Sequence, residues 1–148
     1  MSQQTVITRA GEGIALDILG TTTRFLCTGE QTGKAWSLME ASIPQGTGAP
    51  PHRHAWGEAY YVLEGEMRFM VDGESYLIKA GEFLFAPAGS LHAFEGHSPE
   101  PARMLVFDAP AHAESFFRDV HEQVREMPRD LGTMLEIGNR HQVEFALP

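Results

Sequence analysis

The spacing of three histidines and one glutamate restricts the fold of this chain more than any other sequence feature. His52 and His54 are two residues apart, Glu58 follows four positions later, and His92 comes soon after the turn sequence Pro87–Gly89. Successive side chains of a β-strand point to opposite faces, so His52 and His54 can face one interior, and Glu58 has the same parity if the extended conformation continues. Because the turn reverses the chain, His92 belongs to a different strand. We therefore expect a β-fold whose neighbouring strands bring the four side chains together.

These residue types suit one divalent transition-metal ion. Neutral imidazoles are ligands for Fe, Mn, Ni, Co, Cu and Zn, and one carboxylate balances part of the charge of the ion. Three histidines and one glutamate leave about two positions open on an octahedral ion, as a catalytic site requires and a closed structural site does not. An isolated His-x-His pair is more often a surface or core pair than a ligand pair, so the prediction depends on the joint spacing of all four residues.

The first hundred residues favour many short strands separated by glycine, proline and Asn/Asp-type turn signals. Asp72-Gly73 is a strong two-residue hairpin signal, and the proline- and glycine-rich stretch 44–51 is expected to be a loop. Short strands at near-regular spacing are typical of an antiparallel sandwich or barrel. The expected strands are Ala35–Ile43, Glu58–Leu63, Met67–Val71, Ser75–Lys79, Phe83–Phe85, His92–Phe94 and Met104–Phe107.

The pattern becomes helical near residue 110. Pro110 suits a first helical position with Asp108 as a cap, and Met127-Pro128 is expected to end that helix. A second short helix is expected over Leu131–Ile137. We predict that residues 110–148 form a helical segment that packs on a β-domain of residues 1–109, within the same domain. An apolar stripe, interpreted as core packing, is formed by Phe116, Phe117, Val120 and Val124.

Charge and cysteine content exclude several classes of partner and site. A net charge of −9 repels phosphate backbones and anionic lipid headgroups, so we expect neither a nucleic-acid nor a membrane partner. The single cysteine, Cys27, excludes an intrachain disulfide and a zinc site built from cysteines. No apolar run approaches the roughly 20 residues of a membrane helix, and the N-terminus lacks the pattern of a secretory signal. The expected location is the cytoplasm.

Two spaced motifs in this chain resemble those of the cupin superfamily. The first, over residues 46–65, has Gly46, five residues, His52, one residue, His54, three residues, Glu58, six residues and Gly65. The second, over residues 81–96, has Gly81, five residues, Pro87-Ala88-Gly89, two residues and His92. The chain departs from the pattern at Gly96, where the family often has Asn; that position is not a metal ligand.

The resemblance implies a cupin jelly-roll β-barrel with a metal ion held by His52, His54, Glu58 and His92. A looser similarity, from residue 30 to the C-terminal tail, is to small single-cupin proteins of the quercetin 2,3-dioxygenase type. This implies a metal-dependent dioxygenase that oxidises a small phenolic or enolic, flavonol-like substrate with O2. Fe, Mn, Ni or Co is the favoured ion, with Cu or Zn as alternatives. In this interpretation Glu58 is both ligand and general base, and Tyr60 orients the reacting groups.

Two other functional classes stay open, because a cupin fold does not determine function. One is a redox-neutral lyase, isomerase or polyketide cyclase; the triplet Glu58-Ala59-Tyr60 resembles that of cupin-type sulfoniopropionate lyases, in which a tyrosine is the base. The other is a cupin that binds a small ligand without catalysis.

Alternation also predicts the wall of the substrate pocket. If Glu58 faces inward, so do Tyr60 and Val62, and Phe94 faces inward with His92. Met39 precedes the first motif and, with Tyr60 and Phe94, is a candidate substrate-binding residue, whereas the direction of Trp56 is left open. The expected substrate is small and mostly apolar.

The remaining histidines, His97, His112, His121 and His141, are expected to lie on the surface rather than to bind metal. Jelly rolls have sheet edges that must be covered, and similar cupins are commonly dimers. We therefore predict a homodimer whose contacts involve Thr5–Ile7 and the helical tail.

Overall fold

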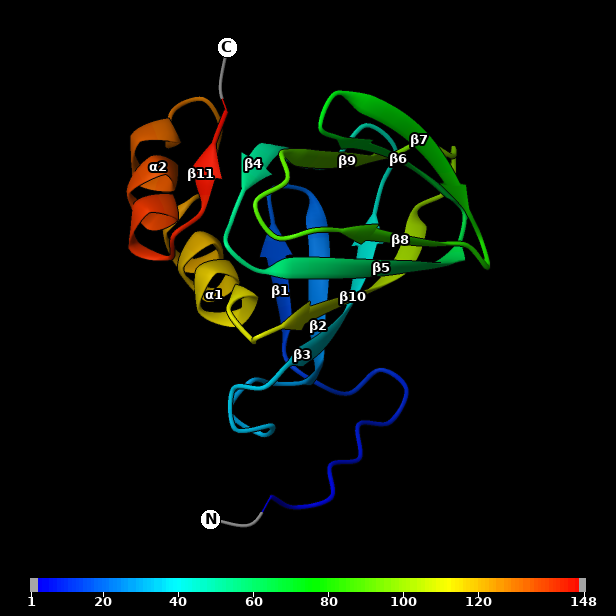
Figure 1. Cartoon of the computed structure of the whole chain (residues 1–148), viewed down its shortest axis with the longest axis vertical. Helices are drawn as coiled ribbons and strands as arrows, with labels where there is room; N and C mark the ends of the chain where they lie inside the picture. The colour runs from blue at the N-terminus through cyan, green and yellow to red at the C-terminus, as the bar shows by residue number, and fades with distance from the viewer. Residues whose placement is uncertain (1–2, 147–148) are drawn as a thin grey trace.

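Two antiparallel sheets face each other and carry two helices at one end in the computed structural model, which describes residues 3–146 (Figure 1). The six-stranded sheet has the order β1-β2-β3-β10-β5-β8, and the five-stranded sheet has the order β11-β4-β9-β6-β7. The helices follow the last long strand and cover the end of the sheets where β4 and β5 are joined (Figure 1). This confirms the prediction of an all-β jelly roll with a C-terminal helical segment.

The elements are short, as the turn signals predicted. The six-stranded sheet contains β1 (Ala15–Ile18), β2 (Thr21–Cys27), β3 (Ser37–Ile43), β10 (Ala102–Ala109), β5 (Gly57–Glu64) and β8 (Phe83–Ala86). The five-stranded sheet contains β11 (Glu144–Phe145), β4 (Gly48–Arg53), β9 (His92–Gly96), β6 (Glu66–Val71) and β7 (Glu74–Lys79). The helices are α1 (Ala113–Gln123) and α2 (Leu131–Arg140).

Alternating side chains of each strand build the core between the sheets. In β3, every second residue from Ser37 to Ile43 is buried, and the residues between them are partly exposed. In β5, Tyr60 and Val62 are buried, as predicted, and Met67 of β6 meets them from the opposite sheet. Each large apolar side chain buried in this way stabilises the fold by about 1.5–3 kcal/mol. The burial therefore fixes the register of the strands that carry the site residues.

Two hairpin turns have similar backbone conformations, but the sequence predicts only one of them. The predicted turn at Asp72-Gly73 is confirmed: both residues have positive φ (49° and 86°) between β6 and β7. The turn between β1 and β2 has the same character at Leu19 and Gly20 (φ 49° and 90°). No strand was predicted in this region, because leucine seldom adopts positive φ and Leu-Gly is not a usual hairpin signal.

The expectation of a loop over residues 44–51 is wrong in part, because β4 begins at Gly48. The ladder between β4 and β9 shifts register between Ala49 and His52, so Pro50 and Pro51 lie where no regular backbone N–H is needed. Gly48 lets the strands approach closely: a Cβ at this position would lie 2.0 Å from the carbonyl oxygen of Phe94.

The first helix begins later than predicted, at Ala113 rather than at Pro110. Asp108 does act on its N-terminus, but from outside the helix. One carboxylate oxygen of Asp108 accepts the backbone N–H groups of His112 and Ala113, at 2.8 and 2.9 Å. These hydrogen bonds satisfy backbone N–H groups that have no partner within the first turn of a helix. The helix therefore begins where the Asp108 carboxylate is close enough to accept them.

The first helix also ends earlier than predicted, at Gln123 rather than at Met127. The carboxylate of Asp130 accepts the backbone N–H groups of Arg125 and Glu126, at 2.8 and 3.0 Å, and so turns the chain away from the helix axis. The second predicted helix is confirmed as α2. Neither α1 nor α2 is long and apolar enough to cross a membrane.

Candidate metal centre and its cavity

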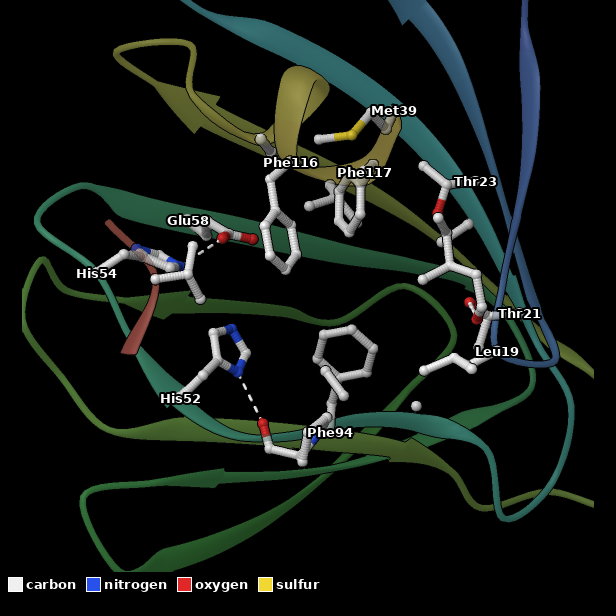
Figure 2. A pocket seen from close by; sticks show the side chains of 18 of the residues that line it. Leu19, Thr21, Thr23, Met39, His52, His54, Glu58, Phe94, Phe116 and Phe117 are labelled. Atoms are coloured by element: carbon white, nitrogen blue, oxygen red, sulfur yellow. Dashed lines mark hydrogen bonds and ion pairs between the residues drawn. The ribbon is translucent and has the colours of Figure 1, made fainter. Parts of the chain in front are cut away.

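The four predicted ligand residues come together inside the jelly roll from β4, β9 and the start of β5. His52 lies in β4, His54 directly after it, Glu58 in β5 and His92 in β9. All four are buried, and one potential ligand atom of each lies within 4.8 Å of those of the others. Figure 2 shows His52, His54 and Glu58 at one end of a cavity. His52 and His54 face one interior as predicted, whereas the chain bends at residues 55–56, so unbroken strand alternation does not account for the direction of Glu58.

Backbone carbonyl groups determine which nitrogen of each imidazole faces the cluster. The Nδ1 atoms of His52, His54 and His92 lie 2.8, 2.8 and 3.0 Å from the carbonyl oxygens of Pro50, Trp56 and Ser90. A carbonyl oxygen only accepts, so each Nδ1 carries the proton and donates it. In a neutral ring the Nε2 lone pair is then free to bind a metal ion, and the ring orientation is fixed.

The electrostatic environment favours the charge states that bind a metal. Burial, with His92 nearby, lowers the pKa of His52 to about 4, and burial also lowers the pKa of His92. Burial alone would raise the pKa of Glu58, but His54 and the other two histidines outweigh it, so the pKa lies below its ordinary value. Neutral imidazoles and an ionised carboxylate are the forms that act as ligands.

Two ring nitrogens of the cluster have no hydrogen-bond partner among residues 3–146. They are Nε2 of His54 and Nε2 of His92, and both are buried. Nε2 of His54 lies 2.7 Å from Oε1 of Glu58, an ion-pair distance, without making a hydrogen bond. Buried polar atoms normally have partners, and one cation between these ligand atoms would supply them. The residues present thus fit a divalent metal ion.

Tyr60 acts on the second oxygen of Glu58. Its hydroxyl donates a hydrogen bond to Oε2 at 2.9 Å, and both side chains are buried. Burial and the neighbouring Glu58 raise the pKa of Tyr60 well above its ordinary value, so the hydroxyl keeps its proton. Tyr60 does not line the cavity; its hydroxyl holds Glu58 with Oε1 toward His54.

The turn of the second motif is joined to the first motif by a backbone hydrogen bond. Gly89 has a φ of +80°, a conformation that glycine adopts without strain. In this position its N–H donates to the carbonyl oxygen of His54 at 2.8 Å. The hydroxyl of Ser90 closes the same turn by donating to the carbonyl oxygen of Pro87 at 2.6 Å. The spacing of the second motif therefore fixes both the turn before His92 and the backbone that carries His54.

A cavity of about 90 Å³ opens beside the cluster. Met39 and Phe94 line it as predicted; Trp56, for which the sequence predicts no direction, lines it too. The core-packing prediction for the stripe on α1 is confirmed for Val120 and Val124, which are buried in a hydrophobic cluster. Phe116 and Phe117 also pack against the core, and in addition they line the cavity (Figure 2). Helical periodicity showed that these side chains share a face, but not that this face covers an opening of the jelly roll.

Two threonines of β2, Thr21 and Thr23, also line the cavity and were not predicted to do so. Their strand was not identified from the sequence, so no alternation argument could assign them a face. They lie at the end of the cavity opposite His52 and Glu58 (Figure 2).

A stack of three rings joins the cluster to the first helix. The ring of Trp56 lies 4.1 Å from that of His54 and 4.5 Å from that of His112, nearly parallel to both. His112 is exposed, as expected for a surface histidine. Two other histidines outside the cluster make tertiary contacts: His121 with the backbone of Asp17 at 3.1 Å, and His141 with Asp119 at 2.6 Å.

Comparison with known proteins gives a family and several relatives. Residues 39–108 match a family model described as "Cupin domain". The chain is 28% identical over 115 residues to the quercetin 2,3-dioxygenase of Bacillus subtilis (strain 168). The matched region covers 76% of this chain but only 33% of the length of that relative.

Solved structures share the fold. An RmlC-like cupin from Shewanella frigidimarina superposes with a TM-score of 0.65 at 22% identity, over 78% of this chain and 99% of that one. The polyketide cyclase RemF from Streptomyces resistomycificus superposes with a TM-score of 0.60 at 26% identity, over 74% of this chain and 80% of that one.

Proposed function

Because this chain belongs to the cupin superfamily, we propose that it is a metal-dependent enzyme, and that it oxidises a small phenolic or enolic substrate with O2. The observation that carries the proposal is the cluster of three histidines and one glutamate at one end of a mostly apolar cavity. Four protein ligands would leave coordination positions open on a metal ion, as a catalytic site requires and a closed structural site does not. The similarity to quercetin 2,3-dioxygenase supports the choice of reaction.

His52, His54, Glu58 and His92 would hold the ion, and Fe, Mn, Ni or Co suits this ligand set best, with Cu or Zn as alternatives. When bound, such an ion supplies Lewis-acid and redox chemistry toward oxygen. The three histidines keep a fixed tautomer through their Nδ1 bonds to backbone carbonyls. The binding geometry is therefore largely organised before substrate arrives.

Glu58 is the base in this proposal. Its carboxylate lies in the cavity wall and takes the proton of the substrate hydroxyl, which leaves the substrate as an anion beside the cluster. Tyr60 orients the carboxylate through the hydrogen bond to Oε2. Burial and the charge of Glu58 raise the pKa of Tyr60 in the metal-free chain, so its hydroxyl is the donor in this hydrogen bond.

The cavity volume bears on the size of the substrate. About 90 Å³ is well below the roughly 300–1,000 Å³ of sites that hold drug-sized ligands. A substrate with one aromatic or enolic ring suits this volume better than a flavonol with three rings. A flavonol would need Phe116 and Phe117 of α1 to move away from the cavity.

An oxygen electrode tests the proposal directly. Protein loaded with Fe, Mn, Co or Ni is mixed with catechols, small enols and a flavonol, and O2 uptake is recorded beside elemental analysis of the metal content. We expect uptake with at least one single-ring substrate, and loss of uptake in Glu58→Gln. Absence of uptake with every metal and substrate would contradict the proposed reaction.

A redox-neutral cyclisation or isomerisation is the second candidate. The similarity to the polyketide cyclase RemF favours it, since the match covers most of both chains. The same base and the same cavity would serve that reaction without O2. Turnover under strict anaerobiosis would favour this candidate, whereas ligand binding without turnover in either atmosphere would leave a ligand-binding cupin.

A further inference from the structure

We propose that Thr23 is a second anchor for the substrate, at the end of the cavity remote from the His–Glu cluster. In this proposal, which rests on the proposed function, the Thr23 hydroxyl forms a hydrogen bond to a neutral polar substituent of the substrate. The substrate class is then a small molecule with an oxygen at the metal end, a short apolar body, and a hydroxyl or carbonyl at the other end.

The position of β2 places Thr23 across the cavity from Glu58. Three strand spacings separate β2 from β5 in the order β2-β3-β10-β5, or about 14 Å along the sheet at the usual spacing. Thr21 and Thr23 are 6% and 5% exposed and face inward, and Figure 2 shows them opposite the cluster, beyond Phe94 and Phe117. Since side chains from both ends extend inward, a molecule of one or two rings spans the remaining distance.

The two threonines differ in how their hydroxyls are used. Thr21 donates its hydroxyl to the carbonyl oxygen of Ile18 at 2.8 Å and so closes the turn between β1 and β2. Thr23 makes no side-chain hydrogen bond to any residue from 3 to 146, although it is buried and lines the cavity. Its cross-strand neighbours are apolar: Ala41 lies directly opposite on β3 and Leu16 directly opposite on β1.

A free hydroxyl in such surroundings indicates a ligand. The Thr23 hydroxyl has no partner in the described chain, yet it is not one of the enclosed polar atoms that lack one, so its oxygen faces the open space of the cavity, where a ligand can pair with it. A site built to hydrogen-bond a substrate hydroxyl rejects an analogue that lacks it, because the protein group is left unpaired. The unpaired hydroxyl of Thr23 therefore favours a specificity contact over simple packing.

The residues that line the cavity also restrict the charge of the substrate substituent that would lie near Thr23. Among the described residues that line the cavity there is no lysine or arginine. A carboxylate or phosphate at the Thr23 end would lose its hydration without gaining a counter-charge. A neutral hydroxyl or carbonyl meets no such penalty, so we assign the Thr23 end to a neutral group.

Binding of matched catechols tests this assignment without relying on turnover. The protein is loaded with Zn²⁺, and isothermal titration calorimetry compares 4-(hydroxyalkyl)catechols of one to three carbons with 4-alkylcatechols of the same length. In the unmodified chain we expect at least one hydroxyalkyl compound to bind about fivefold tighter than its alkyl partner, the value for one neutral hydrogen bond.

Three variants identify the residue responsible. Thr23→Val keeps the shape of the side chain but removes the hydroxyl, so it should abolish the preference for the hydroxyalkyl compounds. Thr23→Ser should keep the preference, because it retains the hydroxyl. Thr22→Val is the matched control: Thr22 is the next residue, on the opposite face of β2, and its hydroxyl lies 3.4 Å from Asp17.

The possible failures are distinguishable. Equal binding of hydroxyalkyl and alkyl compounds by the unmodified chain, or a preference that survives in Thr23→Val, would overturn the assignment of Thr23 and leave the proposed function intact. If no catechol of either series binds the Zn²⁺-loaded protein, the phenolic substrate class itself is wrong, and the Thr23 proposal is wrong with it.

Discussion

Tyr60 and Glu58 form a buried pair in which one residue positions the other. The Tyr60 hydroxyl occupies Oε2 of Glu58 and leaves Oε1 for the cluster. Loss of a hydrogen bond to a ligand typically weakens metal affinity 10- to 100-fold. We therefore predict that Tyr60→Phe lowers the affinity for divalent metal by about tenfold, measured by competition with a chelator.

The matched control for this prediction is Tyr61→Phe. Tyr61 is the next residue on β5 and is 42% exposed on the outer face of the sheet, so its hydroxyl cannot reach the cluster. Equal metal affinity in Tyr60→Phe and Tyr61→Phe would show that the hydrogen bond to Glu58 does not position the ligand.

The burial of His52 makes the stability of the metal-free protein depend on pH. The pKa of His52 is about 4 in the folded chain and about 6.5 in the unfolded chain, so the unfolded chain binds the proton first. Stability is therefore highest above pH 6.5 and falls as the pH drops toward 4, by roughly 2–3 kcal/mol at pH 4.5. Urea unfolding of the metal-free protein at pH 7.5 and 4.5 measures this loss.

A pair of variants distinguishes the contribution of His52 to this pH dependence from the contributions of other titrating groups. His52→Gln should show a clearly smaller loss of stability between pH 7.5 and 4.5. His97→Gln should keep the full loss, because His97 lies outside the cluster. An unfolding free energy of the unmodified chain that does not change over this range would contradict the prediction.

At the residue scale, the cluster of His52, His54, Glu58 and His92 was predictable from the sequence, whereas the residues at the remote end of the cavity were not. His52 and His54 are two apart, and a period of two makes them share a face once a strand is assumed. Thr23 carries no such signal, since threonine is common in strands whatever it faces. Its role depends on which side chains lie across the cavity, and those come from strands far apart in the sequence.

At the scale of elements, Asp108 joins the sheet to the first helix. Asp108 is fully buried at the end of β10, accepts the hydroxyl of Ser37, and accepts the N–H groups of His112 and Ala113. Asp108→Ala would leave three donors without an acceptor, and we predict a loss of about 3 kcal/mol of unfolding free energy. Denaturant unfolding checks the size of the loss.

Hydrogen exchange locates the effect of Asp108→Ala. We expect the amides of α1 to exchange faster than those of β5 and β10, since the contact that starts the helix is gone. Glu122→Ala, an exposed position of α1, is the control and should change neither measurement. A uniform increase in exchange across the sheet would mean that Asp108 supports the strands rather than the helix.

Element boundaries also show where sequence reasoning stops. The strands between residues 57 and 109 were identified because their apolar alternation and turn residues agree, whereas β11 (Glu144–Phe145) was not predicted because it lies in a segment expected to be helical. The start of β4 was missed because Pro50 and Pro51 argue against a strand unless the ladder is known to be irregular there. The ends of α1 were misplaced because Asp108 and Asp130 reach the helix through tertiary contacts that a local cap pattern does not contain.

At the scale of the whole molecule, the cavity belongs to both parts of the chain. Its wall combines strand residues such as Met39 and Phe94 with Phe116 and Phe117 of α1, and Trp56 stacks between His54 and His112. We propose that residues 1–109 and 110–148 fold as one domain. Far-UV circular dichroism and tryptophan fluorescence should then report coincident unfolding transitions, whereas separate transitions would divide the chain.

Two exposed apolar surfaces are candidates for the contact of the predicted homodimer. Val6 and Ile7, both within the predicted contact segment, are 36% and 66% exposed. The outer face of β5, β8 and β10 exposes a second apolar group, of which Phe83 and Phe85 are 59% and 55% exposed on the edge strand β8. Exposed apolar groups of this kind mark contact surfaces, and an unpaired edge strand favours association.

Sedimentation velocity of the full chain tests the dimer and its salt dependence together. Two copies that each carry −9 repel one another, and salt screens that repulsion, so we expect the dimer fraction to rise between 20 mM and 500 mM NaCl. Ile7→Asp should shift the equilibrium toward monomer if the N-terminal segment forms the contact, whereas Phe85→Asp should do so if the β8 edge forms it. A monomer at all salt concentrations would remove the prediction, because an apolar contact strong enough to overcome the repulsion would then not exist.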